Sequence, residues 1–516
     1  YITSNPNLTL KLEYDTNDYK EEFGDTELKV DSPFNVGLNY QFNLDQQQVD
    51  FSLGVIRGNA LYANLAFGTN LNDRGKPRYT APPEILNQPY LEPFQELDSD
   101  WQKYLSELIM WQMGNEGFVT HKIIFNDDEL QAEISQGRFK QTIQAIDLAS
   151  RILANNSPTN IEKITVINID MGVETLRASI PRETLVEVVA NGPLVEKYVE
   201  FNLPETVNDN SIIRDNDYIY PHFSWSIQPH MTGTLQHQIR FYFWQLEALI
   251  HTEYALKKGL YLMADIGIDI ANNFDEYTWH TPDGQLHHVR QNRRLYLREG
   301  ESGLRRMALD YLVNINSNIT AKISAGYLEW MYGGIGGEVL YIPDHKNWAL
   351  GIDAYWVKQR EFDQKFSFKD YQTVTGFISF YYDLPFYDLR LKADAGKFLG
   401  KDTGVMVDIS RRFLTGARVG ARVALTNCDP LCVGEGAFNK WIYFNLPMDL
   451  FSTKSSRGRG GYEWSPLTKD AGQKVEPGRL FGLMMSAPEE VDSLRRNPWS
   501  IKKILSGFGT SSKKKI

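Results

Sequence analysis

The stretch RMALDYLVNIN, residues 306–316, alternates apolar and polar side chains, and this alternation decides the fold. Successive side chains of a β-strand point to opposite faces of a sheet, so a two-residue period predicts a strand with one apolar and one polar face. The apolar parity holds Met307, Leu309, Tyr311, Val313 and Ile315, and the polar parity holds Arg306, Asp310, Asn314 and Asn316.

The same alternation recurs along residues 220–451, in about a dozen runs. The short connections fall at 257–259, 317–318, 345–347, 385–388 and 415–416, and the long ones near 272–304, 360–370, 398–404 and 428–436. Short turns on one side and long loops on the other are typical of outer-membrane β-barrels. We therefore predict a transmembrane barrel of about twelve antiparallel strands over residues 213–451. A soluble β-sandwich is the alternative; it explains the strands but not the rhythm of the loops.

Two further segments precede this barrel. Residues 1–71 hold four strand-like runs, too few to close a barrel, and are interpreted as the last strands of an N-terminal barrel. Residues 72–212 change to helical spacing behind the capping candidates Asp98 and Ser99, then suggest a duplicated ββα unit: strands near 119–134 and 161–180, helices near 139–154 and 181–190. The segment joins strand ends on the short-turn side, so we expect a periplasmic α/β domain.

Residues 452–516 form a C-terminal extension. Strand candidates at 462–467 and 479–485 predict either a further hairpin of the second barrel or a periplasmic tail, and the sequence leaves both open. The fold class is thus mostly β, with tandem antiparallel barrels and an intervening α/β domain.

Composition narrows the class of protein. The formal net charge of -11 over 516 residues argues against nucleic-acid binding. No apolar run is long enough for a membrane helix, so membrane contact has to come from strands. The aromatic share of 13% suits the girdles of a membrane barrel.

Charged side chains on the polar parity are predicted to line the barrel interior. They are Asp265, Asp269, Arg306, Asp310, Lys322, Asp353, Arg390, Lys392, Asp394, Asp408, Arg412, Arg418 and Arg422. Mutual ion pairing is the plainer interpretation of so many opposite charges in a narrow space. The functional interpretation is a polar track that contacts a polysaccharide, with Tyr261, Tyr355 and Tyr443 as stacking surfaces.

Signals for catalysis and metal binding are weak. His280, His287 and His288 lie in a long polar loop without a carboxylate at metal-ligand spacing, and the stretch GGIGGE at 333–338 lacks the helix and Lys of a phosphate loop and is interpreted as a turn. No serine lies in a nucleophile elbow. We predict no enzymatic activity, no cofactor and no metal. Cys428 and Cys432 could form a disulfide; two free thiols or a metal pair remain alternatives.

Several stretches closely resemble the YjbH/GfcD family of outer-membrane proteins encoded with exopolysaccharide and group 4 capsule loci of Gram-negative bacteria. They are YPHFSWSIQP (220–229), NNFDEYTW (272–279), AGYLEWMYGGIGGEVLYIP (325–343), REFDQKFSFKDYQTVTG (360–376), GEGAFNKWIYFNLPMDLF (434–451) and WSPLTKDAGQ (464–473). Over residues 1–210 the resemblance rests mainly on the order of elements and on PFNVGLNYQ. The family would begin with a signal peptide, often with a lipidation cysteine, and with most of a first barrel, so lipidation is not assigned here.

The resemblance implies tandem barrels around a periplasmic α/β region and a role in secretion or surface assembly of exopolysaccharide or capsule, with no enzymatic activity to carry over. The expected partners are a polysaccharide, outer-membrane lipid and periplasmic proteins of the same export system. The expected location is the bacterial outer membrane, with the middle domain in the periplasm. The alternative is a closed-barrel scaffold or anchor for an export complex; a barrel hydrolase would need a clustered nucleophile and base that the sequence does not supply.

Overall fold

A computed structural model describes residues 5–17, 29–44, 47–68, 71, 92–158, 160–188, 194, 198–201, 210–235, 242–277, 286–344, 346–413, 415–428, 438–451, 457–465 and 470–491. The chain divides into two compact units, residues 1–77 with 413–415, and the remainder. Residues 72–91, with Pro82 and Pro83, and the tail beyond residue 491 lie outside the described residues.

The first unit contains a four-stranded antiparallel sheet in the order β1-β2-β3-β4. Its strands are β1 (Leu8–Tyr14), β2 (Phe34–Leu44), β3 (Gln47–Ile56) and β4 (Ala60–Gly68). Leu12, Leu53 and Leu61 are exposed on the apolar face, whereas the opposite face carries the Asn39 amide, which donates to Ser52 Oγ at 2.9 Å. The sheet is open among the described residues, so the predicted first barrel stays a prediction.

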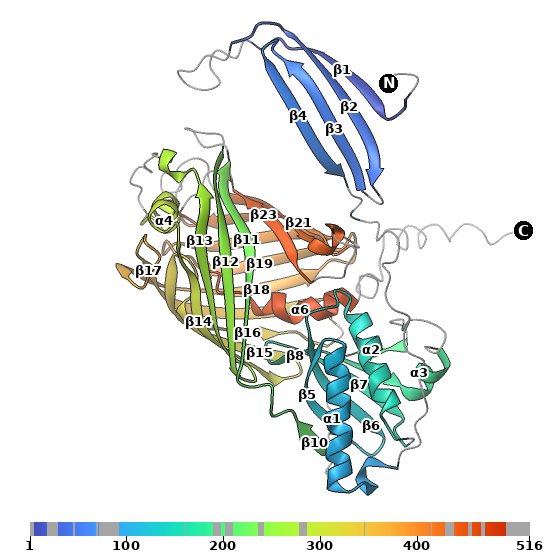
Figure 1. Cartoon of the computed structure of the whole chain (residues 1–516). Helices are drawn as coiled ribbons and strands as arrows, with labels where there is room; N and C mark the ends of the chain where they lie inside the picture. The colour runs from blue at the N-terminus through green and yellow to red at the C-terminus, as the bar shows by residue number, and fades with distance from the viewer. Residues whose placement is uncertain are drawn as a thin grey trace, which may run out of the picture. The chain divides into compact units, whose positions relative to one another are not determined.

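An α/β domain opens the second unit, with a six-stranded sheet in the order β10-β5-β6-β7-β8-β9 (Figure 1). Its strands are β5 (Phe118–Phe125), β6 (Glu129–Gln136), β7 (Lys163–Asp170), β8 (Val173–Pro181), β9 (Glu200–Phe201) and β10 (Ile212–Asp215), and its helices are η1 (Phe94–Glu96), α1 (Ser99–Asn115), α2 (Thr142–Asn155) and α3 (Arg182–Val188). Asp98 caps α1, as predicted, because its carboxylate accepts from the backbone N–H groups of Asp100 and Trp101. The strand pairs and helices lie within a few residues of the predicted ranges.

The core of this domain forms between the sheet and helices α1 and α2. Ile109, Met113, Ile146 and Leu153 from the helices share one buried cluster with Ile123 and other strand side chains. Strands β6 and β7 pair in parallel across the α2 connection, while every other pairing in the sheet is antiparallel. The two ββ pairs are therefore joined side by side through one helical crossover.

The remaining chain forms a sheet of thirteen antiparallel strands in sequence order, from β11 to β23. They are β11 (His222–Leu235), β12 (Tyr242–Lys257), β13 (Leu260–Asn272), β14 (Gly303–Asn316), β15 (Ile319–Tyr327), β16 (Tyr332–Tyr341), β17 (Trp348–Arg360), β18 (Phe368–Asp383), β19 (Leu389–Lys397), β20 (Thr403–Arg412), β21 (Arg418–Thr426), β22 (Asn439–Pro447) and β23 (Arg459–Trp464). Helices η4 (Phe274–Glu276), α4 (Arg293–Glu299) and η5 (Met448–Phe451) interrupt the connections, and α6 (Leu480–Val491) follows the last strand.

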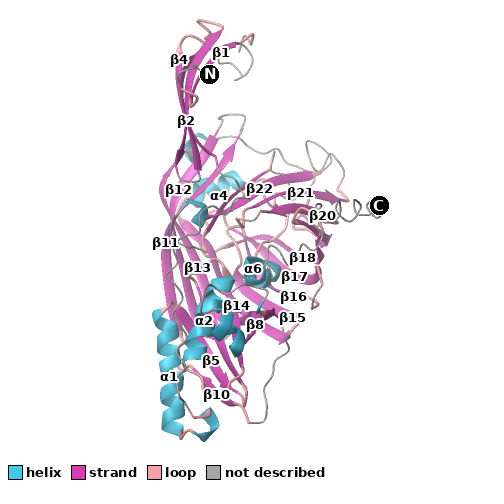
Figure 2. Ribbon diagram, turned by 90° about the vertical axis from the view of Figure 1, so that its right-hand side faces the viewer, coloured by secondary structure: helices cyan, strands magenta, loops and turns pink. Residues whose placement is uncertain are grey.

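The edge strands of this sheet are β11 and β23, and no ladder joins them among the described residues. The described sheet is thus large but not closed, so the predicted barrel closure stays a prediction. Strands β11–β22 fall within the range expected to hold about twelve, and β23 adds one more. Figure 2 shows the strands arranged around helix α6.

Two local expectations were wrong. Residues 333–338 belong to strand β16 and are not a turn, because a Cβ at Gly336 would clash with the Tyr355 ring on the neighbouring strand, so glycine lets that ring lie flat on the sheet. Residues 480–485 belong to helix α6 and are not a strand, so the expected hairpin does not form from them. Leu480, Phe481, Met484 and Met485 pack as one apolar side of that helix.

Burial in the large sheet is inverted relative to a sheet that covers an apolar core. On β17, Ile352 is 54% exposed while its neighbour Asp353 is 5% exposed. Leu309, Ile323 and Ile378 are likewise exposed, while Asp310, Lys322 and Ser379 beside or near them are buried. The apolar face is thus the outer one, and it is much larger than the scattered apolar surface of an ordinary soluble protein.

Candidate functional site: the inner face of the large sheet

The inner face is the side of the large sheet that carries Asp310, Lys322, Glu338, Asp353 and Asp394. Strand register brings these side chains together from different strands: Lys322 lies opposite Glu338, and Glu338 lies opposite Asp353. The register also pairs Asp265 with Arg306, and Asp408 with Arg422. The charged and tyrosine residues predicted for the interior share this parity, and their contact with a polysaccharide stays a prediction.

Many of these charges neutralise one another. Arg306 Nη2 lies 2.5 Å from Asp310 Oδ2, and Lys392 Nζ lies 3.1 Å from Asp394 Oδ2. Asp408 accepts from Arg422 Nε at 3.3 Å and from the Tyr443 hydroxyl at 2.9 Å. This is the arrangement that the ion-paired interpretation predicts, and it leaves these groups engaged with protein partners.

Other predicted residues have separate partners. Asp265 Oδ1 lies 2.5 Å from His251 Nδ1, and Asp269 accepts from the Gln245 amide at 2.8 Å. Arg390 forms two hydrogen bonds to the Asp383 carboxylate. The remaining four are placed as follows: Arg412 and Arg418 line a cavity of about 30 Å³, and Tyr261 and Tyr355 are buried.

The sequence did not predict that the chain itself would cover this face. Residues 470–486, called the C-terminal segment here, lie against it. Lys474 Nζ lies 2.7 Å from Asp394 Oδ2, and Arg479 forms an ion pair with Asp353. Lys322 Nζ donates to the carbonyls of Pro477 at 2.8 Å and Gly478 at 3.0 Å. The segment therefore supplies further partners for charged groups of the strands.

Helix α6 closes the same face with apolar contacts. The Phe481 and Tyr381 rings stack with their centroids 3.8 Å apart, and the Leu480 N–H donates to Glu338 Oε2 at 3.1 Å. Leu480, Met484 and Met485 share a buried cluster with Val173 of the α/β domain. Helix α6 is thus packed between the large sheet and the α/β domain (Figure 1).

The start of the C-terminal segment is held by the connection between β13 and β14. Asp470 accepts the backbone N–H groups of Val289, Arg290 and Gln291 at 2.8, 2.8 and 3.0 Å, and its second oxygen lies 2.7 Å from His288 Nδ1. A carboxylate with several N–H donors is a strong anchor. His287 packs flat on Tyr371, so these two histidines are structural, whereas His280 lies outside the described residues.

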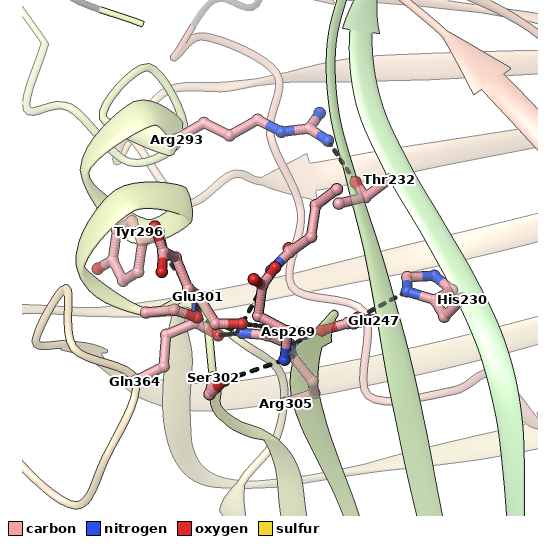
Figure 3. A network of polar contacts seen from close by, with 12 residues as sticks. His230, Thr232, Glu247, Asp269, Arg293, Tyr296, Glu301, Ser302, Arg305 and Gln364 are labelled. Atoms are coloured by element: carbon pink, nitrogen blue, oxygen red, sulfur yellow. Dashed lines mark hydrogen bonds and ion pairs between the residues drawn. The ribbon is translucent and has the colours of Figure 1, made fainter. Parts of the chain in front are cut away.

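A second polar network near the same connection also escaped prediction (Figure 3). Glu247 is buried at 2% exposure, and its carboxylate binds Arg305 at 2.6 and 3.0 Å and His230 Nδ1 at 2.7 Å. Arg305 also donates to Gln364 Oε1 at 2.6 Å, which links β14 to the β17–β18 connection. The signal in the sequence was Glu247, a carboxylate on the polar parity of β12.

The α/β domain is fixed to the short-turn end of the large sheet. Lys258 Nζ lies 2.7 Å from Glu133 Oε2, and the Glu174 N–H donates to Asn314 Oδ1 at 2.7 Å. Arg457 lies just before the last strand, β23, and its Nη2 lies 3.0 Å from Asp170 Oδ2 of the α/β domain. These contacts join the domain to the turns between strands.

His121 lies at this junction as a neutral imidazole. Ser135 Oγ donates to the Ile169 carbonyl, so it accepts from His121 Nε2 at 2.7 Å, and Nδ1 is left to accept from the Tyr220 hydroxyl at 3.3 Å. Burial, helped by the nearby Lys258 ammonium, lowers the pKa of His121 to about 4, while Glu133 acts in the opposite direction.

The described residues bear on the metal prediction and on the disulfide prediction to different extents. In the described part of the chain, no three His, Cys, Asp or Glu side chains are placed to hold a metal ion together. Cys428 is in a disulfide bond, and Cys432 lies outside the described residues. None of the helices in the described ranges has the length and apolar character needed to cross a bilayer.

Comparison with known proteins gives two matches. Residues 1–485 match the model of a family described as "Exopolysaccharide biosynthesis protein YbjH". A curated relative from Escherichia coli strain K12, named "Uncharacterized lipoprotein YjbH", is 30% identical over 490 residues, which cover 92% of this chain and 68% of the relative.

Proposed function

Because this chain belongs to the YjbH family, we propose that it is an outer-membrane protein that takes part in secretion or surface assembly of exopolysaccharide, without enzymatic activity of its own. The observation that carries the proposal is the inverted large sheet, whose outer face is apolar and whose inner face is charged. An apolar band around a polar interior is the pattern of a β-sheet that faces lipid.

Two observations support the proposed location. The Escherichia coli relative is named a lipoprotein, which favours an association with the cell envelope. The α/β domain binds the short-turn end of the sheet through Lys258 and Asn314, and short turns face the periplasm in outer-membrane proteins. The domain is then placed to meet periplasmic proteins of the export system, while the sheet meets lipid and polysaccharide.

A closed scaffold is the second candidate, and a specific observation favours it. The C-terminal segment occupies the inner face through Lys474, Arg479 and the Phe481 ring, so the predicted polar track is engaged with protein side chains. In this form the protein would anchor an export complex and would not conduct polymer. A conduit requires the C-terminal segment to leave the inner face, which would break these contacts.

The proposal that the outer face of the large sheet contacts lipid can be tested by introducing one charged side chain there. Ile352→Arg places a cation on the outer face of β17, where contact with lipid would cost about 2–4 kcal/mol near the bilayer centre. The matched control is Trp111→Arg on α1, a side chain 65% exposed compared with 54% for Ile352. We expect the first variant, but not the second, to reduce the amount of folded protein in the outer membrane. Equal recovery of both variants would remove the membrane assignment.

The physiological role needs a separate measurement. Deletion of the chain from its own organism should reduce exopolysaccharide on the cell surface, as measured by quantitative sugar analysis of washed cells. Complementation with the complete chain should restore it. Unchanged surface polymer in the deletion strain would contradict the proposed function.

A further inference from the structure

A cavity of about 220 Å³ lies between the edge strands of the large sheet. Gly233 of β11 forms one wall, Tyr462 and Trp464 of β23 form another, and Arg293 of α4 reaches the cavity from the long-loop side. The volume is many times that of one water and below the roughly 300 Å³ at which drug-sized pockets begin. It suits one or two sugar units and not a folded partner.

Four aromatic side chains line this cavity beside seven charged ones. Trp330 and Trp441 line it together with Tyr462 and Trp464. The flat apolar faces of indole and phenol rings suit the C–H faces of pyranose rings, and their N–H and O–H groups can bond to hydroxyls. Aromatic faces beside charged and polar groups suit a ligand that has both C–H faces and hydroxyls, as a sugar does.

The acidic groups of the cavity favour a hydroxyl-rich ligand. Glu329, Glu463 and Glu476 line it, and carboxylates accept hydrogen bonds from hydroxyls. A phosphodiester of a lipid headgroup has oxygens that accept but no hydroxyl that donates, so it would offer these carboxylates no hydrogen bond. The cavity is therefore better matched to a saccharide than to a phospholipid.

The cationic groups of the cavity differ in whether a carboxylate of the protein pairs with them. Arg290 is held by both oxygens of Glu329, at 2.8 and 3.0 Å, and Arg422 lies between Asp408 and Glu463. Lys474 is paired with Asp394. These groups are neutralised within the protein, so none of them calls for an anionic ligand.

Arg293 is the exception. Its Nη2 donates to Thr232 Oγ1 at 3.1 Å, as Figure 3 shows, and its guanidinium lies 5.7 Å from the centre of the Trp330 ring. Its Nε is buried without a hydrogen-bond partner, and no carboxylate pairs with it among the residues that the structure describes. An arginine fork beside an indole is matched by a planar carboxylate.

We propose that this cavity binds a carboxylated saccharide unit, with the carboxylate on Arg293 and the sugar ring against Trp330 and Trp464. The inference rests on the proposed function for the choice of a saccharide. It deepens that function by naming the acidic class and the residues that select it.

The test uses the complete chain in detergent micelles and two probes of equal size, trigalacturonate and its methyl ester, titrated by calorimetry. We expect the acid to bind at least about tenfold more tightly than the ester, because esterification removes the charge that Arg293 recognises. Arg293→Gln should abolish this preference. The matched control is Arg298→Gln on the same helix, an exposed side chain outside the cavity, which should keep it.

Other results would overturn the proposal. These are equal binding of acid and ester, no binding of either, an acid preference that survives in Arg293→Gln, or competition by anionic phospholipid vesicles as strong as by the acid. Arg293→Lys keeps a charge without the fork and should show an intermediate preference, which guards against misfolding of the glutamine variant. Surface polymer after gene deletion is scored separately. Normal polymer with intact acid binding would contradict the proposed function alone, while reduced polymer without acid binding would contradict this inference alone.

Discussion

Lys474 and Asp394 form a buried ion pair with Nζ and Oδ2 2.7 Å apart, although 80 residues separate them in the chain. Asp394 lies on strand β19 and also contacts Lys392 at 3.1 Å, so one carboxylate joins a strand residue and the C-terminal segment. The inner face is thus completed by residues that follow the last strand. Its stability and its accessibility depend on the same contacts.

The two cations of the C-terminal segment should differ in their effect when removed. Lys474→Met leaves Asp394 with Lys392 as a partner, whereas Arg479→Met leaves Asp353 buried without its partner. Loss of one member of a buried pair typically costs about 3–5 kcal/mol. We expect Arg479→Met to approach that range and Lys474→Met to stay below it, measured by urea unfolding in micelles. Equal destabilisation by the two variants would argue against this assignment of partners.

Removal of the C-terminal segment should open the inner face. A chain truncated before residue 470 loses the contacts to Asp353, Asp394 and Glu338, whereas a chain truncated after residue 491 keeps them. In planar bilayers we expect ion conductance from the first truncation and little from the second or from the complete chain. Silence of both truncations, with correct membrane insertion, would support the scaffold. Steady conductance of the complete chain would contradict closure by this segment.

The junction at His121 should weaken in acid. Its pKa is about 4 in the folded protein and about 6.5 when unfolded, so the neutral form is favoured by folding. This stabilisation is complete above pH 6.5 and is lost as the pH falls towards 4. The shift of about 2.5 units corresponds to about 3 kcal/mol at most. Unfolding free energies at pH 7.5 and 4.5 should differ less in His121→Gln than in the wild type. As a control, His222→Gln, at an exposed position, should leave the difference unchanged.

Docking of the α/β domain should depend on the absence of a side chain at Gly172. This residue has a φ of 77°, and a Cβ there would clash with the backbone of Gly259 in the β12–β13 turn. Gly117 has a similar φ of 86°, but its nearest neighbour would be 3.7 Å away. Both alanine variants carry backbone strain, and Gly172→Ala alone adds the clash. We expect faster protease cleavage between the domain and the sheet only in Gly172→Ala; matching cleavage rates would show that the turn contact is unimportant.

The sequence predicted the faces of the large sheet well because its signal is local. Adjacent residues of a strand lie on opposite faces of the sheet. An apolar residue followed by a polar one, as in Leu309 and Asp310, therefore indicates the two faces without any distant contact. The same holds for the capping of α1 by Asp98, which requires two backbone N–H groups nearby in the chain. The sequence predicted mutual ion pairing on the polar face in general, whereas specific pairs such as Asp408 and Arg422 came only from the register of the strands.

The rest could not be predicted because it depends on contacts between distant segments. The apolar run at 480–485 has no clear two-residue period, and its helical form is fixed by packing between Tyr381 and Val173. The glycines at 336 and 337 suggested a turn, but their small size instead leaves room for the Tyr355 ring and for the backbone of the adjacent strand. Asp470 gave no signal either, since its partners are backbone N–H groups about 180 residues earlier.

Chain order gives the C-terminal segment a particular place in the folding of this protein. Asp353 and Asp394 lie on strands, whereas Arg479 and Lys474, which pair with them, follow the last strand. The ladders of the sheet can therefore form before these pairs do, and the inner face stays wet until the segment docks. An intermediate with complete ladders and an undocked segment would expose charges that the finished protein buries.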